Sequence, residues 1–183
     1  MSCDITHGRL EQCKDVVGGL QAIYILNYGL YDPLIDIVYN AGTDEITNIN
    51  IAGSTPIYKF ELKGTNSFET TITSSRENGT TFFEQVLAVQ LKKQDVQTHK
   101  EIKLLTYGRP NIIVRTNANQ YFIAGLVRGM DVTAGTIGNG TNLGDMNGYS
   151  LTFTGQEAVP ANFLDCSTEA QLEVLLNNAI ITI

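Results

Sequence analysis

The chain has 183 residues and a mass of 20.0 kDa, the size of one domain with a full hydrophobic core. Hydrophobic residues make up 43% of the chain and charged residues 17%, which excludes a largely disordered protein. The net charge of −7 argues against a protein that holds nucleic acid by neutralising phosphates. No window approaches the roughly 18 consecutive apolar residues of a membrane span, and the first residues lack the apolar core of a signal peptide, so we expect a soluble protein with no membrane partner, made in the cytoplasm.

The charged residues are unevenly distributed along the chain. All 12 basic residues lie within residues 1–128. The segment 129–183 has no Lys or Arg, and its acidic residues are Asp131, Asp145, Glu157, Asp165, Glu169 and Glu173. The last third of the chain is therefore purely acidic.

The first 19 residues are expected to form an extended N-terminal arm on a single domain that spans residues 1–183. The arm contains the apolar residues Leu10, Val16 and Val17, but it is short and ends in Gly18-Gly19. Because such a segment cannot bury its own apolar side chains, we predict that it packs on a neighbouring subunit.

The chain from residue 22 to residue 92 is predicted to form strands. Residues 57–63 alternate apolar and polar side chains, as a half-buried strand does, and residues 22–28 are apolar on both faces. Asn78-Gly79 supplies turn residues between two Thr-rich segments and predicts a long hairpin. The strands expected here are 22–28, 47–52, 57–63, 67–75 and 80–92, the last of which also fits a helix in part.

The second half of the chain is predicted to contain further strands and one or two helices. Residues 97–106 have a helical pattern that stops at Gly108 and Pro110, and Thr168 with Gln171 forms a capping box that opens a short helix at 168–177. The Gly-rich run 135–148 is interpreted as a long flexible loop between strands. Further strands are expected at 111–116 and 121–127, joined as a hairpin, and at 149–154. The predicted class is mainly β with one or two helices.

No group of residues in the sequence has the pattern of an active site. The histidines are His7, in the arm, and His99, on the outer side of a helix, so neither is placed as a catalytic base. The Gly-rich run lacks the Lys-Ser/Thr and the following helix of a phosphate loop, Asp145-Met146-Asn147-Gly148 is only part of a calcium loop, and the three cysteines have no metal-ligand spacing. We therefore expect no enzyme, no cofactor and no metal, and favour a structural or assembly protein.

Several segments resemble structural proteins of tailed phages. Cys13–Asn27 is similar to the opening of virion proteins from phages of Bacteroidetes hosts. A longer resemblance is to the final strands of phage tail tube proteins, and its segments are 121–133, 143–157 and 160–163. These are strand and turn patterns rather than chemical motifs.

The resemblance implies a tail-tube-like fold, a β-sandwich or half-barrel of antiparallel strands with a flanking helix. It also implies homohexameric rings that stack into a tube, located in the virion tail, through which DNA passes as transient and non-specific cargo. The implied partners are other copies of the chain, the tape measure, tail terminator and baseplate or tip proteins, and a sheath if the tail is contractile. Tail terminators and tail completion proteins share this fold.

Two sets of residues are candidates for function in such a tube. A channel wall should be acidic and polar so that DNA slides without sticking. The lumen-facing candidates are Asp131, Asp145, Glu157, Ser150, Thr152 and Thr154. The candidates for contacts between subunits are Leu10, Val16, Val17, Phe68, Ile72, Asn78 and Gly79.

Two other interpretations stay open. The chain can be another β-sandwich virion assembly protein, such as a tail terminator, a neck or head protein, or a receptor-contacting protein. It can also be a small enzyme whose site has no recognised pattern. A protein that forms tubes or rings supports the tail tube, whereas a stable monomer supports the first alternative.

Overall fold

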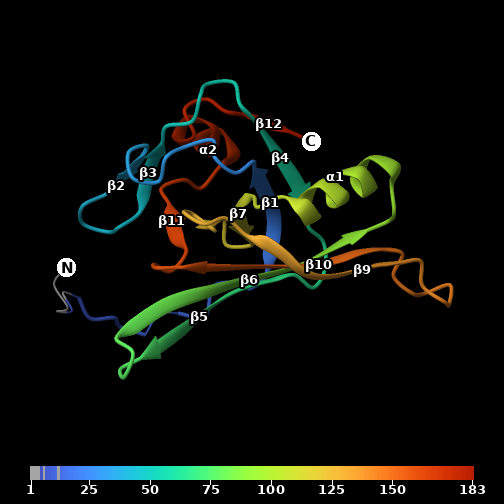
Figure 1. The fold of residues 1–183 in the computed structure, drawn as a ribbon, viewed down its shortest axis with the longest axis horizontal. Helices are drawn as coiled ribbons and strands as arrows, with labels where there is room; N and C mark the ends of the chain where they lie inside the picture. Colours follow the sequence, from blue (N-terminus) through green and yellow to red (C-terminus); the bar gives the residue numbers. More distant parts are fainter. Residues whose placement is uncertain (1–4, 6, 12) are drawn as a thin grey trace.

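The computed structural model describes residue 5 and residues 7–11 and 13–183. Two β-sheets pack face to face, and two helices flank them (Figure 1). The strands are β1 (Leu20–Leu26), β2 (Ile37–Tyr39), β3 (Ile46–Ile49), β4 (Pro56–Glu61), β5 (Ser67–Ser75), β6 (Thr80–Lys92), β7 (Asn111–Thr116), β8 (Tyr121–Ala124), β9 (Asp131–Gly138), β10 (Gly148–Glu157), β11 (Asn162–Leu164) and β12 (Ile180–Thr182). The helices are α1 (Val96–Tyr107) and α2 (Glu169–Leu175). The mainly β class and the sandwich with flanking helices are confirmed.

The larger sheet has eight strands in the order β12-β4-β1-β7-β8-β11-β3-β2. Most of its neighbouring strands are antiparallel, but β12 runs parallel to β4 and β11 runs parallel to β3. The sheet is therefore mixed, whereas only antiparallel strands were expected. Its central strand β1 is buried on both faces, as the apolar sequence of that segment predicts.

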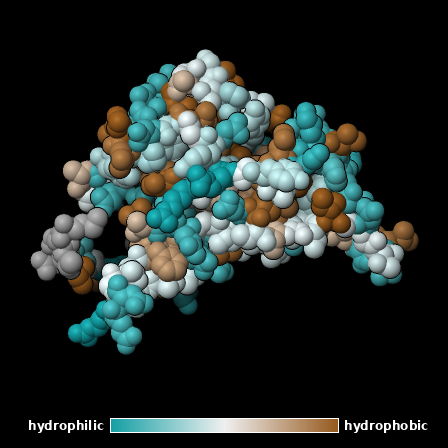
Figure 2. Space-filling view, viewed as in Figure 1, coloured by the Kyte–Doolittle hydropathy of each residue, from teal (hydrophilic) through white to brown (hydrophobic). Residues whose placement is uncertain are grey.

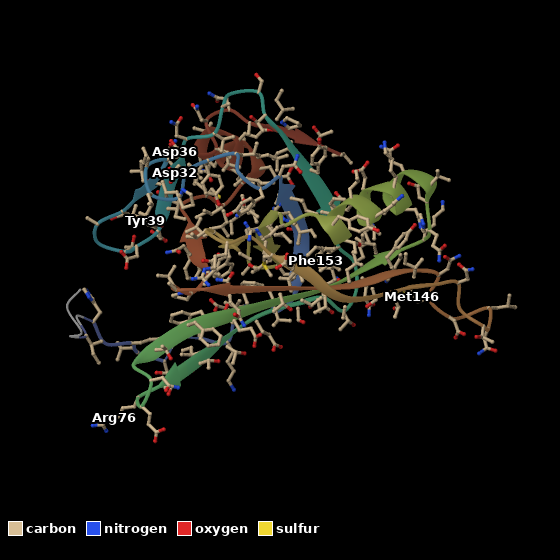
Figure 3. The ribbon with its side chains drawn as sticks, viewed as in Figure 1. Asp32, Asp36, Tyr39, Arg76, Met146 and Phe153 are labelled. Atoms are coloured by element: carbon tan, nitrogen blue, oxygen red, sulfur yellow. The ribbon has the colours of Figure 1, made fainter. Side chains whose placement is uncertain are left out.

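The smaller sheet has four antiparallel strands in the order β5-β6-β10-β9. It lies across the larger sheet and extends beyond it at both ends (Figure 1). At one end the β5–β6 hairpin projects, with Arg76 at its tip, and at the other end the loop from β9 to β10 projects, with Met146 on it (Figure 3). Both sheets are open.

Two hydrophobic cores hold the layers together. The core between the sheets contains Leu87, Tyr149 and Phe153 from the smaller sheet and Ile23 from β1, and Ile102 of α1 closes it at one end. The second core lies on the opposite face of the larger sheet, where Leu172 and Leu175 of α2 pack against it. Because the outer face of the smaller sheet is not covered by any described element, that sheet has one face free.

Both predicted helices form, and each follows a capping residue, of which only Thr168 was predicted from the sequence. The Asp95 carboxylate accepts a hydrogen bond from the backbone N–H of Thr98 at 3.1 Å, and this bond holds the pKa of Asp95 below its usual value. The hydroxyl of Thr168 accepts from the N–H of Gln171 at 3.4 Å, as the capping-box pattern predicts.

The structure corrects part of the prediction that residues 135–148 form a long flexible loop. The first four of these residues belong to β9, and only 139–147 form a loop. Gly135 fits in this strand because a Cβ would lie 2.9 Å from the carbonyl oxygen of Ser150 on β10. The glycine therefore allows close approach of two backbones rather than loop flexibility.

Candidate functional site

The free face of the smaller sheet carries four of the six lumen-facing candidates, Asp131, Ser150, Thr152 and Thr154. Along β10, Tyr149, Leu151 and Phe153 are buried, and Ser150, Thr152 and Thr154 alternate with them and are partly exposed. The predicted alternation is confirmed. The hydroxyls of Thr154 and Thr133 lie 2.9 Å apart, which links β10 to β9 on this face.

Strand register extends the same face across all four strands, because paired residues point to one side of a sheet. Thr154 pairs with Val86, which pairs with Glu69, and Gln156 pairs with Glu84. On β9, Asp131 pairs with Thr154. We call this surface the outer face, and its polar residues are Ser67, Glu69, Thr71, Thr73, Glu84, Gln90, Lys92, Asp131, Thr133, Thr136, Ser150, Thr152, Thr154 and Gln156.

The outer face carries mainly hydroxyl groups and negative charge. Its acidic residues are Glu69, Glu84 and Asp131, and its one basic residue is Lys92 at the end of β6. Asp131 was predicted from the sequence, but the two glutamates were not. Counting back in register from the Asn78-Gly79 turn could have placed both glutamates on one side of the hairpin, but only the pairing of β6 with β10 shows that this side belongs to the outer face.

Two of the predicted acidic residues lie elsewhere. Glu157 is 2% exposed and accepts hydrogen bonds from the backbone N–H groups of Val127 at 3.0 Å and Arg128 at 2.7 Å. The expectation that Glu157 faces solvent is wrong, because it is in phase with Tyr149 and Phe153 on the inner side of β10. Its carboxylate instead fixes the turn after β8.

Asp145 lies in the loop between β9 and β10. Its carboxylate accepts from the N–H groups of Asn142 at 2.7 Å and Thr141 at 2.8 Å, and these bonds lower the pKa of Asp145. Asp145 therefore shapes a loop at one end of the smaller sheet and does not belong to the outer face.

Both edges of the smaller sheet are long strands. β5 has nine residues and β9 has eight, and neither has a second neighbour among the described residues. In contrast, the edge strands of the larger sheet, β2 and β12, have three residues each. Long free edges present a row of unpaired backbone groups that can pair with another chain, so the smaller sheet has the edges suited to assembly.

The β5–β6 hairpin carries four of the predicted contact residues. Ile72 is 66% exposed, and Asn78 and Gly79 are exposed at the tip, where only Gly79 has a positive φ, +61°. Phe68 differs, because its ring lies 6.3 Å from that of Phe122 and is partly buried within the same subunit. The exposed part of the hairpin therefore begins beyond Phe68.

The arm leaves the domain beside the β7–β8 hairpin. The side-chain amide of Asn117 donates to the carbonyl of Gly18 at 2.8 Å. The backbone N–H of Asn117 donates to the carbonyl of Gly19 at 3.0 Å. Beyond this anchor Leu10, Val16 and Val17 are exposed by 70% or more. Their apolar side chains are not covered by the described part of their own subunit.

A charged cluster that the sequence analysis missed lies where α2 meets the larger sheet. Glu169 Oε1 accepts from Lys59 Nζ at 2.7 Å, from the Tyr24 hydroxyl at 2.8 Å and from Arg115 Nη1 at 3.3 Å. Burial opposes ionisation of Glu169, but the hydrogen bonds from Lys59 and Tyr24 and the two positive charges hold its pKa below the usual value. The cluster joins three strands to the start of α2.

The other reactive side chains that the structure describes form no cluster. Within the described ranges, no group of three or more His, Cys, Asp and Glu is placed to hold a metal ion, and no helix is long and apolar enough to cross a membrane. The ring of His99 lies 6.1 Å from that of Tyr149, and burial raises the pKa of the Cys166 thiol to about 12. Cys13 is exposed in the arm.

Comparison with known proteins adds no relative. No family model, no curated protein and no solved structure matches the chain.

Proposed function

We propose that the protein is a virion structural subunit that assembles into stacked homohexameric rings, and that these rings form a phage tail tube through which DNA passes. The observation that carries the proposal is an open four-stranded sheet with long free edges whose uncovered face is polar and acidic. The resemblance of residues 121–133 and 143–157 to tail tube strands supports the same function.

In this proposal β5 of one copy pairs with β9 of the next copy around the ring. Such pairing closes the sheets into one barrel and removes both free edges. A contact between two different surfaces of identical subunits generates a closed ring when the rotation closes. The ring therefore needs no strand beyond those already formed in the subunit.

The size of such a barrel suits a DNA channel. Six copies of the smaller sheet give about 24 strands, which at about 4.8 Å spacing and a tilt of about 40° enclose a backbone circle about 48 Å across. Side chains on both walls narrow this opening but leave room for a double helix.

The outer face has the chemistry of a wall along which a polyanion slides. Hydroxyl groups from Ser150, Thr152 and Thr154 stay hydrated and carry no positive charge to bind phosphates. Glu69, Glu84 and Asp131 add a repulsion that is screened over about 8 Å at physiological salt, so it centres the DNA without blocking it.

A cysteine pair on the two edge strands tests the ring. In a background with the native cysteines replaced by serine, Ala134→Cys on β9 is combined with Thr71→Cys or Thr73→Cys on β5. Within one chain these strands are three spacings apart, about 14 Å, which exceeds the reach of a disulfide. Oxidation of the assembled protein should give a ladder of covalent oligomers that ends at six.

The matched control combines Thr71→Cys with Ser150→Cys, because Ser150 lies on the central strand β10 of the same face. This pair should give no ladder. A protein that stays monomeric in size-exclusion chromatography and electron microscopy, with no ladder from either β5 position, contradicts the proposal and favours another virion protein. Single rings that never stack favour a tail terminator.

A further inference from the structure

An apolar groove lies between α1 and the neighbouring strands of the larger sheet. It encloses about 330 Å³. Its apolar lining residues include Ile25, Tyr28, Tyr58, Phe60, Leu104 and Leu105. Tyr28, Tyr58 and Leu104 are 40% to 56% exposed, and Figure 2 shows hydrophobic side chains around the α1 region. The groove is thus an uncovered apolar surface of a size that accepts a leucine side chain and its neighbours.

The groove has one charge of each sign among its lining residues. Glu101 projects from α1, and Arg109 follows the helix, with its guanidinium 4.2 Å from the centre of the Tyr28 ring. A segment that fits this groove should therefore carry an apolar side chain flanked by a basic and an acidic one.

The arm of the same chain contains such a segment. Arg9 and Glu11 flank Leu10, which is 89% exposed. Ile5, further along the arm, is 93% exposed. Burying a leucine stabilises a contact by about 2 kcal/mol, so both the arm and the groove gain from covering each other.

The arm and the groove lie at opposite ends of one subunit. Figure 1 shows the described residues just before β1 on the side where the β5–β6 hairpin projects, and α1 at the other end. Asn117 fixes Gly18 and Gly19 at the start of β1, whereas the groove includes Ile25 near the end of that strand. The described residues before Gly19 run away from their own groove (Figure 1), which favours the arm of a second copy as the occupant.

We propose that Leu10, with Arg9 and Glu11, docks in the α1 groove of the next copy along the stack, where Arg9 pairs with Glu101 and Glu11 with Arg109. The inference rests on the proposed function in that it names the contact between rings. It joins two different surfaces at opposite ends of the molecule, and such a contact extends without limit along an axis. The edge pairing closes the ring, and the arm links one ring to the next.

A mixture of single-cysteine chains tests whether the arm in the groove comes from the same copy or from another copy. One full-length chain carries Leu10→Cys and the other carries Leu104→Cys, both with the native cysteines replaced by serine. Because neither chain carries both cysteines, a disulfide between positions 10 and 104 can form only between two copies. Replacing the second chain by one with Val174→Cys, an exposed position on α2, should abolish the product. A disulfide that forms only when one chain carries both cysteines shows that the arm folds back on its own groove and overturns the proposal.

A binding assay makes the test independent of tube formation. A labelled peptide of residues 1–19 is titrated into full-length Leu10→Asp protein, whose own arm cannot compete. We expect saturable binding that weakens about tenfold or more when the receptor also carries Leu104→Asp, but not when it carries Val174→Asp. An Arg9→Glu peptide should bind weakly to this receptor and regain affinity for one with Glu101→Arg.

The two proposals fail in different ways. Disulfides between β5 and β9 without binding of the arm peptide contradict the groove contact but still support the ring. Arm binding without edge disulfides contradicts the tube and leaves a contact between copies. Equal binding to the Leu104→Asp and Val174→Asp receptors, or no saturable binding at all, overturns the groove contact.

Discussion

Lys59 Nζ lies 2.7 Å from Glu169 Oε1, and this ion pair connects β4 to the first residue of α2. Tyr24 and Arg115 bind the same oxygen. Glu169 also lies in the first turn of its helix, where the helix dipole favours a negative charge. Several favourable contacts of one carboxylate therefore hold α2 on the larger sheet.

Stability should fall with acid partly because of Glu169. Its pKa is lower in the folded chain than in the unfolded chain, so its contribution is present above the unfolded pKa and is lost as the pH falls through the folded pKa. Glu169→Gln should remove this contribution, so that the variant loses less stability than the wild type between pH 7 and pH 3. Urea unfolding at both pH values measures the difference. Glu173→Gln on the same helix is the matched control, and an identical response of both variants would refute the assignment.

Lys59 should contribute to stability in a way that is lost at high pH. The hydrogen bond to Glu169 raises the pKa of Lys59 in the folded chain, although burial acts in the opposite direction. Its contribution is present below the unfolded pKa and disappears as the pH rises through the folded pKa. Lys59→Met should therefore be less stable than the wild type at pH 8, with a difference that shrinks above pH about 10.5. A difference that does not change with pH would show that the loss is one of packing.

Glu157 is predicted to be a stability residue rather than a channel residue. Glu157→Ala leaves the N–H groups of Val127 and Arg128 without their acceptor and should cost about 1 to 3 kcal/mol of unfolding free energy. Glu157→Gln keeps one acceptor oxygen and should cost less. Equal losses for the two variants in urea unfolding would show that the hydrogen bonds are not the cause.

The projecting part of the β5–β6 hairpin should be ordered by assembly. Residues 70–81 are mostly exposed in the subunit, whereas Leu87 and Val89 in the same long strand are fully buried. A two-stranded segment without a packed face is marginal in water. Hydrogen exchange should therefore be fast at 70–81 and slow at 86–90 in the monomer, and slow at both in the assembled form. Equal protection of 70–81 in the two states would contradict assembly through this hairpin.

Reversal of charge on the outer face should make tubes retain DNA. The triple variant Glu69→Lys, Glu84→Lys and Asp131→Lys turns three repulsive sites in each subunit into phosphate-binding sites, and its DNA binding should weaken strongly with added salt. Co-sedimentation of tubes with linear DNA measures the retention. The control is Glu77→Lys, Asp165→Lys and Glu173→Lys, which changes the net charge equally off the outer face. Equal retention by both variants would mean that the outer face does not meet DNA.

The sequence predicted the elements with strong periodicity and missed those set by tertiary contacts. Helix α1 and most of the long strands were found because their side chains repeat over several turns or pleats, and α2 was found from its capping residues Thr168 and Gln171. β2, β11 and β12 have three residues each, too few for a pattern. β9 was missed because its glycine serves close contact with β10. The strand expected at 121–127 ends at Ala124, because Gly125 has a positive φ and Glu157 binds the turn that follows.

Part of the candidate site could be predicted because alternation within a single strand shows which residues share a face. Ser150, Thr152 and Thr154 could be placed because one strand is enough to show alternation. Glu69 and Glu84 lie far from them in sequence, and only strand pairing brings the three strands together. The acidic channel candidates were chosen for their charge, without regard to which side of the strand they occupy. Glu157 was therefore placed on the wrong side of β10.

Electron cryomicroscopy of the purified, assembled protein shows directly how the subunits are arranged. We expect hollow tubes of stacked six-subunit rings in which β5 pairs with β9 of the neighbouring copy. The residues facing the channel should be Ser150, Thr152, Thr154, Glu69, Glu84 and Asp131. Tubes whose channel is lined by the larger sheet, or a lumen with net positive charge, would contradict it.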